Sequence, residues 1–447
     1  MKNIYEILKD FNETNSTNDK IAKLKKYKSN ALFTRILEVT YDKSRFTFGL
    51  TMKNVRQSIK VNPFMELADA VEELEIFTSR KLTGNAAINQ LGYMLDQLSE
   101  EDSKVMELII GRDLKINVGR TNINKVHKGL IVKPVYKRCG IFTKKTESKI
   151  KYPAFCQLKA DGTYREMLLL NGKVEFMSRS GEVYEYPTIE NDAVDSTLKD
   201  GYYFGEITVK GAENRSIGNG LINSDNCPHD DLIFSVWEYA NTEEYKKAKL
   251  KEKDYLPETP YFESFYELEQ SLIMGNFKHI ELIESPQVGS AKEAMVWCSE
   301  WMKMGLEGAV LKNKHMLLKD GTSTDQLKMK LEIDVEVRMI GHREGKKGTK
   351  REGKLGSIQF SNDEGTVKGY ASGFNDSMLD EISENLELYM DKIFTVRCND
   401  ITKGRNNNHY ALSHPRYIEW RNDKNETDTL ARMFEQKESA MLLENIL

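Results

Sequence analysis

The sequence predicts a multidomain α+β protein in which a helical region comes first, a β-rich region follows and a region of short strands comes last. Three observations lead to this prediction. The 447 residues are too many for one ordinary hydrophobic core. Apolar residues recur at helical spacing in the first part of the chain, and after Lys151 the pattern changes to short β-rich runs. We place the domain boundaries at 1–129, 130–331 and 332–447.

Capping residues and amphipathic stretches predict helices in the first region. Residues 15–17 (Asn-Ser-Thr) offer side-chain oxygens of the kind that cap helix N-termini, ahead of an amphipathic run. Pro63 suits the first turn of another helix over 64–77. Further along, Gly111 and Gly119 indicate short helices joined by tight turns.

Short runs of β-branched and aromatic residues, bounded by turn residues, predict strands in the rest of the chain. One helix interrupts them, because apolar residues recur at helical spacing over 291–302 and Gly305 can cap its end. The last region suits a small five-stranded barrel. The expected strands are 154–160, 173–178, 202–209, 231–239 and 279–284 in the central region, and 334–341, 357–361, 366–370 and 393–400 in the last.

The composition, with 39% hydrophobic and 30% charged residues, is typical of a soluble globular protein. The sequence contains no apolar run of about eighteen residues, which is the pattern that predicts a membrane span. The N-terminus, MKNIYEILKD, lacks the apolar core of a signal peptide, so we expect a cytoplasmic protein. The five cysteines are scattered without a CxxC pair, which argues against a zinc knuckle or a disulfide framework.

The net charge of −4 does not exclude a polyanionic partner, because binding depends on where the charges lie. Basic residues greatly outnumber acidic ones over 104–151, and a second basic cluster runs over 338–354. In the first cluster, tight turns can offer backbone N–H groups to phosphates, and four side chains supply positive charge. An alternative is a solvated basic face of a helical domain. The four side chains are Arg112, Lys115, Arg120 and Lys125.

Lys159 begins the tetrapeptide Lys-Ala-Asp-Gly at the end of an apolar strand. A lysine, whose ordinary pKa is about 10.4, must lose its proton before it can attack phosphorus. The strand fixes the direction of the side chain, and Gly162 lets the backbone turn closely past a ligand. Alone, the tetrapeptide fits an exposed turn equally well.

The ordered series of motifs after Lys159 is more specific than any one of them. Lys328 and Lys330 share one face of a strand, where two cations can hold a phosphate. Glu206 and Glu307 can bind Mg²⁺ directly or through water. The series runs Ser178-Arg179-Ser180-Gly181, Gly205-Glu206, Trp237-Glu238, Glu307-Gly308-Ala309-Val310-Leu311-Lys312 and Lys328-Met329-Lys330.

This series resembles the nucleotidyltransferase motifs of ATP-dependent DNA ligases of the T-even bacteriophage type. The resemblance implies a helical DNA-binding domain over 1–129, an adenylyltransferase domain with ATP-grasp-like antiparallel sheets over 130–331, and an OB-fold β-barrel domain over 332–447. The basic segment 341–360 resembles the first hairpin of the ligase OB domain, and 421–424 (Arg-Asn-Asp-Lys) matches its RxDK motif.

The resemblance also implies a nucleophile and a set of ligand contacts. Lys159 is expected to attack the α-phosphate of ATP, release pyrophosphate and hold AMP. The other expected contacts are Gln157 and the backbone of Leu158 at the adenine edge, Trp237 on the adenine face, Glu206 at a ribose hydroxyl or a metal-bound water, Glu307 at the metal, Lys312, Lys328 and Lys330 at phosphate, Arg179 at AMP or the 5′-phosphate of the nick, and Arg421, Asp423 and Lys424 at pyrophosphate in the first step only.

The implied ligands are ATP, Mg²⁺ and nicked double-stranded DNA. The expected contacts to DNA are Arg112, Lys115, Arg120 and Lys125. We expect a monomer with no membrane contact.

The sequence departs from the family at Tyr164, which occupies the arginine position of the KxDGxR motif, while Arg165 comes one residue later. Adjacent strand residues point to opposite faces, so Arg165 can substitute only if a β-bulge redirects it. The Tyr164 hydroxyl is expected to bond a ribose oxygen without supplying charge. Glu238, where the family usually has aspartate, is a smaller departure.

RNA ligases and mRNA capping enzymes use the same lysine chemistry and are the nearest alternatives. The 158 residues before Lys159 favour a DNA ligase, because capping enzymes usually lack a large helical domain there. An NAD-dependent ligase would normally bring a cysteine-rich zinc element. A non-catalytic DNA-binding protein that keeps only the fold would have lost some of Lys159, Glu206, Glu307, Lys328 and Lys330.

Overall fold

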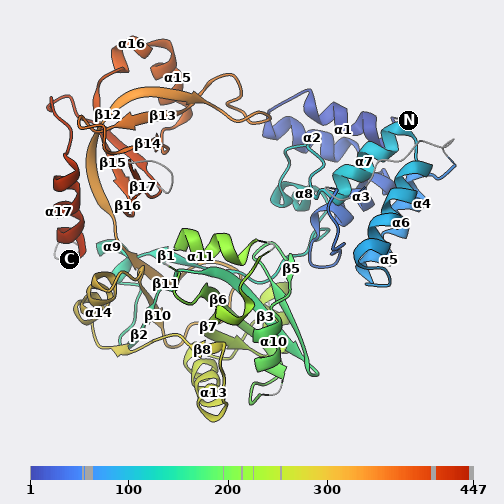
Figure 1. Cartoon of the computed structure of the whole chain (residues 1–447), viewed down its shortest axis with the longest axis horizontal. Coiled ribbons are helices and arrows are strands. Elements are labelled where there is room, and N and C mark those ends of the chain that lie inside the picture. Colours follow the sequence, from blue (N-terminus) through green and yellow to red (C-terminus); the bar gives the residue numbers. More distant parts are fainter. Residues whose placement is uncertain are drawn as a thin grey trace. The chain divides into compact units, whose positions relative to one another are not determined.

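We describe the protein from a computed structural model, which places residues 2–52, 55, 64–194, 196–212, 215–224, 226–251, 254–403 and 409–441. These residues form a mixed α+β structure with several sheets and two compact units (Figure 1). Unit 1 comprises 1–134, 175–185 and 348–350, and unit 2 comprises 135–174, 186–347 and 351–447. None of the described helices has the length and apolar character needed to cross a bilayer.

Unit 1 is built on a helical core, as the sequence predicts for the described residues. Side chains of Asn3, Ser16, Asn30 and Ser99 accept hydrogen bonds from backbone N–H groups in the first turns of four helices. The expected helix start at Pro63 lies outside the described residues. The helices are α1 (Ile4–Asn12), α2 (Thr17–Lys26), α3 (Ala31–Tyr41), α4 (Leu67–Glu73), α5 (Glu75–Thr78), α6 (Gly84–Gln97), α7 (Glu100–Ile110) and α8 (Arg120–Val126).

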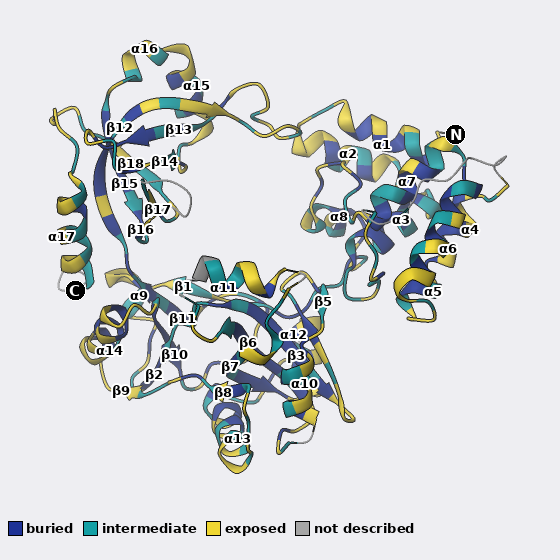
Figure 2. Cartoon of the chain, viewed as in Figure 1, coloured by how far each residue is buried: buried dark blue, intermediate teal, exposed yellow. Residues whose placement is uncertain are grey.

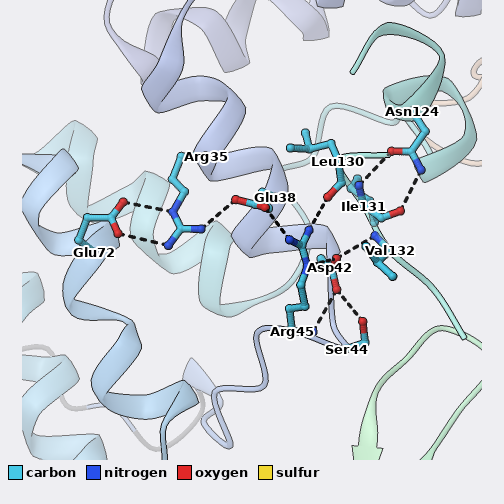
Figure 3. Close-up of polar contacts among 10 residues, drawn as sticks. All are labelled: Arg35, Glu38, Asp42, Ser44, Arg45, Glu72, Asn124, Leu130, Ile131 and Val132. Carbon is cyan, nitrogen blue, oxygen red and sulfur yellow. Dashed lines mark hydrogen bonds and ion pairs between the residues drawn. The ribbon is translucent and has the colours of Figure 1, made fainter. Parts of the chain in front are cut away.

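The end of the first segment of unit 1 is held by a buried carboxylate. Asp42, which is fully buried just after α3, accepts a hydrogen bond of 2.8 Å from the backbone N–H of Val132 (Figure 3). The side chain of Asn124 makes two further hydrogen bonds to the backbone of Ile131. These contacts tie Ile131 and Val132 to unit 1, whose first segment ends at Pro134.

Unit 2 contains a five-stranded sheet of order β1-β11-β10-β2-β9, in which only the β1–β11 pair is parallel among the described residues. Its central strand β10 is buried along its whole length (Figure 2). The strands are β1 (Lys137–Ile141), β2 (Ala154–Leu158), β9 (Gln287–Val288), β10 (Gly308–Asn313) and β11 (Gly321–Lys330), and the short helix α9 (Lys144–Glu147) follows β1.

One face of this sheet packs on α14 (Ala291–Lys303), which confirms the predicted helix. The helix ends just before Gly305, whose φ is +82°. Its N–H bonds the carbonyl of Met302, and the N–H of Leu306 bonds that of Trp301, which together form a Schellman cap. The sheet residues on this apolar face are Ala154, Cys156, Ala309, Leu311, Leu327 and Met329.

A second sheet of unit 2 has the strand order β3-β6-β7-β8, with β7 and β8 parallel. Most predicted strands of the central region are found here. The strands are β3 (Thr163–Leu170), β6 (Gly201–Val209), β7 (Leu232–Ala240) and β8 (Ile280–Leu282), while β4 (Lys173–Met177) pairs with β5 (Val183–Tyr184). The helices that accompany them are α10 (Pro187–Val194), α11 (Arg215–Ile222), η2 (His229–Asp231), α12 (Thr242–Leu250) and α13 (Tyr261–Met274).

The last region contains the predicted strands but not a closed barrel in its described part. Its sheet has the order β14-β13-β12-β15-β18, and the edge strands β14 and β18 are joined by the single bridge Ser372–Arg416. The four residues of β14 are too few to form a long ladder. The elements are β12 (Ile333–Glu344), β13 (Leu355–Ser361), β14 (Lys368–Ala371), β15 (Ile393–Cys398), β16 (Ile401–Lys403), β17 (Tyr410–Leu412), β18 (Arg416–Trp420), α15 (Asp376–Glu384), α16 (Leu386–Tyr389) and α17 (Leu430–Met441).

Candidate active site

The face of the five-stranded sheet opposite α14 is rich in lysine. The register places Val310 beside Gln157 on one side and beside Lys328 on the other. Because side chains alternate along a strand, Lys312 and Lys330 lie on this same face. The pattern of one apolar face and one polar face therefore brings four predicted site residues together.

Lys159 follows β2 directly, and both its backbone and its side chain are held by contacts. Its backbone N–H bonds the carbonyl of Gly308 at 2.9 Å. Its Nζ atom lies 2.5 Å from Oε2 of Glu307, and the two side chains are 20% and 22% exposed. Glu307, predicted as a metal ligand, thus forms an ion pair with the predicted nucleophile. The N–H of Leu158, predicted at the adenine edge, donates to the carbonyl of Glu284.

The turn after Lys159 requires glycine at position 162. A Cβ atom there would lie 2.4 Å from the carbonyl oxygen of Ile207. The N–H of Gly162 donates to Oε2 of Glu206 at 2.7 Å. Glu206 is buried on β6, so its carboxylate fixes the turn that follows the nucleophile.

Three aromatic residues lie close together near Lys312: Tyr164 and Trp237 on the second sheet, and Tyr136 just before β1. The ring centroids of Trp237 and Tyr164 are 6.1 Å apart, and that of Tyr136 lies 5.0 Å from that of Tyr164. Nζ of Lys312 lies 5.8 Å from the Trp237 ring. This distance allows a cation–π attraction between the predicted stacking residue and a predicted phosphate ligand.

Arg165 does not take the place of the missing family arginine. The β3–β6 register runs without a bulge from Thr163 to Leu169, so Arg165 points to the face opposite Tyr164. It is buried there and donates to the hydroxyl of Tyr186 at 2.8 Å. Tyr164 therefore contributes a packed ring to the site and no positive charge.

Lys312 is almost fully buried, at 2% exposure. Burial lowers the pKa of this lysine to about 7, although the nearby carboxylate of Glu238 opposes the shift. Glu238 itself pairs with Lys137, with 2.5 Å between Nζ and Oε1. Sequence reasoning did not assign Lys137 to the site, because it precedes the motif series and meets Glu238 only through the fold.

Glu206 and Glu307 are the carboxylates that the sequence predicts at Mg²⁺. The described residues include no group of three or more histidine, cysteine or carboxylate side chains placed to hold a metal. Mg²⁺ is commonly held by one or two carboxylates together with substrate phosphates and water. Two carboxylates beside a lysine-rich face fit that mode of binding.

Arg179 and the RxDK segment lie outside the five-stranded sheet that carries the lysine cluster. Arg179 is exposed and belongs to unit 1. Arg421 donates two hydrogen bonds to Asp423, of 2.9 and 2.7 Å, and a third of 2.5 Å to Glu336. Lys424 lies 3.8 Å from the same Glu336 oxygen. Glu336, which is buried on β12, is an organising residue that sequence reasoning missed.

Among the predicted DNA contacts, Arg112 has partners inside unit 1. The guanidinium of Arg112 donates to the carbonyl of Val39 at 2.7 Å and lies 3.9 Å from the Phe48 ring. Its charge is half-buried, so it serves the helical core. Lys115 and Lys125 are exposed, whereas Arg120 is half-buried.

The comparisons with known proteins agree with the motifs. The DNA ligases of Enterobacteria phages T4 and T6 are each 29% identical to this chain, over 96% of it and 98% of their own length. A solved structure named Pmar-Lig_PreS3 covers 94% of this chain and 100% of its own, with 19% identity and a TM-score of 0.64. No protein-family model matches the sequence. The resemblance inferred from the motifs therefore extends over nearly the whole chain.

Proposed function

We propose that this chain, a relative of the phage T4 and T6 DNA ligases, is an ATP-dependent DNA ligase that seals nicks in duplex DNA. The observation that carries the proposal is the position of Lys159. It lies at the edge of a sheet face that also bears Lys312, Lys328 and Lys330, with Glu307 at 2.5 Å. Phosphoryl transfer depends mainly on positioning and on stabilising negative charge, and this arrangement supplies both.

In the first step, Nζ of Lys159 attacks the α-phosphorus of ATP. A P–N bond forms, the bond to the bridging oxygen breaks, and pyrophosphate leaves. Glu307 lies where its carboxylate can accept the ammonium proton. Lys312, Lys328 and Lys330 neutralise the phosphates, and Trp237 stacks on adenine beside the ring of Tyr164.

The AMP group then passes to DNA. An oxygen of the 5′-phosphate at the nick attacks the phosphorus of lysyl-AMP, forming an anhydride and releasing Lys159. The 3′-hydroxyl attacks the 5′-phosphorus and displaces AMP, which leaves a phosphodiester bond. Arg179 would contact AMP or the 5′-phosphate, and Arg421, Asp423 and Lys424 would act only on pyrophosphate in the first step.

Mg²⁺, held by Glu307 and Glu206 together with the phosphates, would neutralise charge that develops on the phosphate oxygens. The remaining site residues act through their own contacts. Glu206 fixes the turn at Gly162, and the carboxylate of Glu238, which pairs with Lys137, favours the buried ammonium of Lys312.

The proposal also assigns a role to each of the three expected domains. Residues 1–129 would form a DNA-binding domain in which Lys115, Arg120 and Lys125 contact phosphates. Residues 130–331 would form the adenylyltransferase domain and 332–447 an OB-fold domain. The active species would be a monomer on nicked double-stranded DNA.

Incubation with α-labelled ATP and Mg²⁺, followed by a chase with nicked DNA or nicked RNA, tests this function. We expect covalent label on the wild type, no label on Lys159→Ala, and normal labelling of Lys149→Ala, a lysine outside the site. Label that moves to DNA and yields sealed product supports a DNA ligase. Label retained in Lys159→Ala would overturn the assignment of the nucleophile, and transfer to RNA alone would indicate an RNA ligase.

A further inference from the structure

Two hydroxyl groups enclose the side-chain amide of Gln157. Its Nε2 atom donates to the hydroxyl of Tyr261 at 3.0 Å and to Oγ of Ser285 at 2.9 Å. The side chain is buried, at 3% exposure. Tyr261 is the first residue of α13 and Ser285 lies between β8 and β9, so neither belongs to the motif series around Lys159.

The direction of these hydrogen bonds is set by two backbone carbonyls. Tyr261 donates its hydroxyl proton to the carbonyl of Trp237 at 2.9 Å, and Ser285 donates its proton to that of Ile283 at 3.0 Å. A carbonyl can only accept, and a hydroxyl has one proton. Both hydroxyl oxygens therefore face Gln157 as acceptors.

Two further observations support the role of the Tyr261 hydroxyl oxygen as an acceptor. Lys312 donates to the same hydroxyl oxygen at 3.3 Å, so a second donor points at it. Complete burial raises the pKa of the Tyr261 hydroxyl well above its ordinary value, so the group retains its proton at working pH.

The orientation of the Gln157 amide follows from this arrangement. Its NH₂ group uses both hydrogens on Tyr261 and Ser285. The reversed amide would set its oxygen against two oxygen acceptors and leave buried groups unpaired. The amide atom left for a ligand is Oε1, which is only an acceptor and is bonded to no group in the described part of the chain.

We propose that Tyr261 and Ser285 are positioning residues that fix the Gln157 amide, so that its oxygen selects a purine with an exocyclic amino group over one with a carbonyl. This inference rests on the proposed function. An amino group at the purine 6-position donates to Oε1, whereas a 6-oxo group would meet it acceptor to acceptor. Tyr261 also anchors the backbone of Trp237, so one hydroxyl aligns both the residue at the base edge and the residue on the base face.

The test compares self-labelling of the full chain by ATP and by inosine triphosphate, whose base carries a 6-oxo group. We expect the ratio of kcat/KM for ATP to that for inosine triphosphate to fall roughly tenfold in Ser285→Ala and in Tyr261→Phe. Ser285→Thr keeps the hydroxyl and should keep the ratio. Tyr266→Phe, in the same helix but 37% exposed, is the matched control and should also keep it.

The result that would contradict this inference differs from the result that would contradict the proposed ligase function. Equal loss of activity with both nucleotides in Ser285→Ala and Tyr261→Phe, at an unchanged ratio, would overturn the inference and leave these residues a purely structural role. Ser285→Ala removes one oxygen from a half-buried site, so it tests the ratio even if Tyr261→Phe folds poorly. If the wild type is labelled by neither nucleotide, the proposed ligase function fails instead.

Discussion

Nζ of Lys159 lies 2.5 Å from Oε2 of Glu307. Both side chains are about one-fifth exposed, so the pair is shielded from water on most sides. Glu307 precedes β10, and the hydrogen bond between the backbones of Lys159 and Gly308 holds the two residues in register. The carboxylate can therefore orient the lysine and also receive its proton.

This relationship predicts that Glu307→Gln slows formation of the protein–AMP adduct by about 10²-fold or more, the usual contribution of a positioned acid–base group. The amide keeps the size of the side chain but cannot take the proton. The rate is measured with labelled ATP in a single turnover. Glu300→Gln, on the exposed side of α14, is the control, and a near-normal rate in Glu307→Gln would show that the pair is only a resting contact.

The buried Lys312 predicts a pH-dependent contribution to stability. Its pKa is lowered to about 7 in the folded protein by burial, whereas a lysine in the unfolded chain titrates near about 10.4. Between these values the unfolded chain holds more protons, so the free energy of unfolding rises with pH by at most ~1.4 kcal/mol per unit. Above the window the contribution is fully present, and it is lost as the pH falls toward 7.

Lys312→Met should remove this dependence. The difference in free energy of unfolding between the variant and the wild type is measured by urea denaturation from pH 6.5 to 10. We expect the variant to be favoured most at the lowest pH and the difference to shrink as pH rises. The exposed Lys319→Met should show a constant difference, and the same constant behaviour in Lys312→Met would contradict the assigned shift.

The packing of Tyr164 predicts the effect of restoring the family arginine. Tyr164 is 6% exposed among aromatic rings, so Tyr164→Arg places an unpaired charge in an apolar cluster and should lower stability by about 3 kcal/mol. Tyr164→Phe keeps the ring and should change stability far less. Thermal unfolding measures both variants. A Tyr164→Arg protein that is as stable as the wild type and needs less ATP would show that the site can open to admit the cation.

The sequence was sufficient to predict features that depend on local pattern. Strand alternation placed Lys328 and Lys330 on one face, and the glycine after 291–302 marked the helix end. Features that depend on which strands meet were not predictable. The pair between Lys137 and Glu238 joins residues about a hundred positions apart, and no motif marks it. A barrel was predicted from the number of short strands. The number of strands does not determine how many backbone hydrogen bonds join the edge strands β14 and β18.

Arg112 shows a second limit, because composition does not distinguish a half-buried cation from a solvated one. Its contacts predict that Arg112→Gln lowers stability by about 1–3 kcal/mol.

The exposed Lys115 and Lys125 are expected to affect DNA binding and not stability. Replacing each with glutamine should reduce the dependence of DNA binding on log salt concentration by about 1 per phosphate contact, with little effect on stability. An unchanged salt slope in the double variant would leave these lysines as a solvated surface.

The RxDK segment carries the last prediction. If Lys424 serves only the pyrophosphate step, Lys424→Ala should impair self-adenylylation at least about tenfold and spare sealing of DNA that already carries a 5′-AMP group. The structure supplies a matched control, because Glu336 binds both Arg421 and Lys424 from inside the sheet. Glu336→Gln should weaken the segment as a whole and lower thermal stability, since it leaves two cations without their buried partner. Lys424→Ala removes only the more exposed cation, whose 3.8 Å contact is the longer of the two, so stability should hardly change. Equal loss of both activities in Lys424→Ala, accompanied by lower stability, would mean that the segment supports the fold of this region and does not act on pyrophosphate.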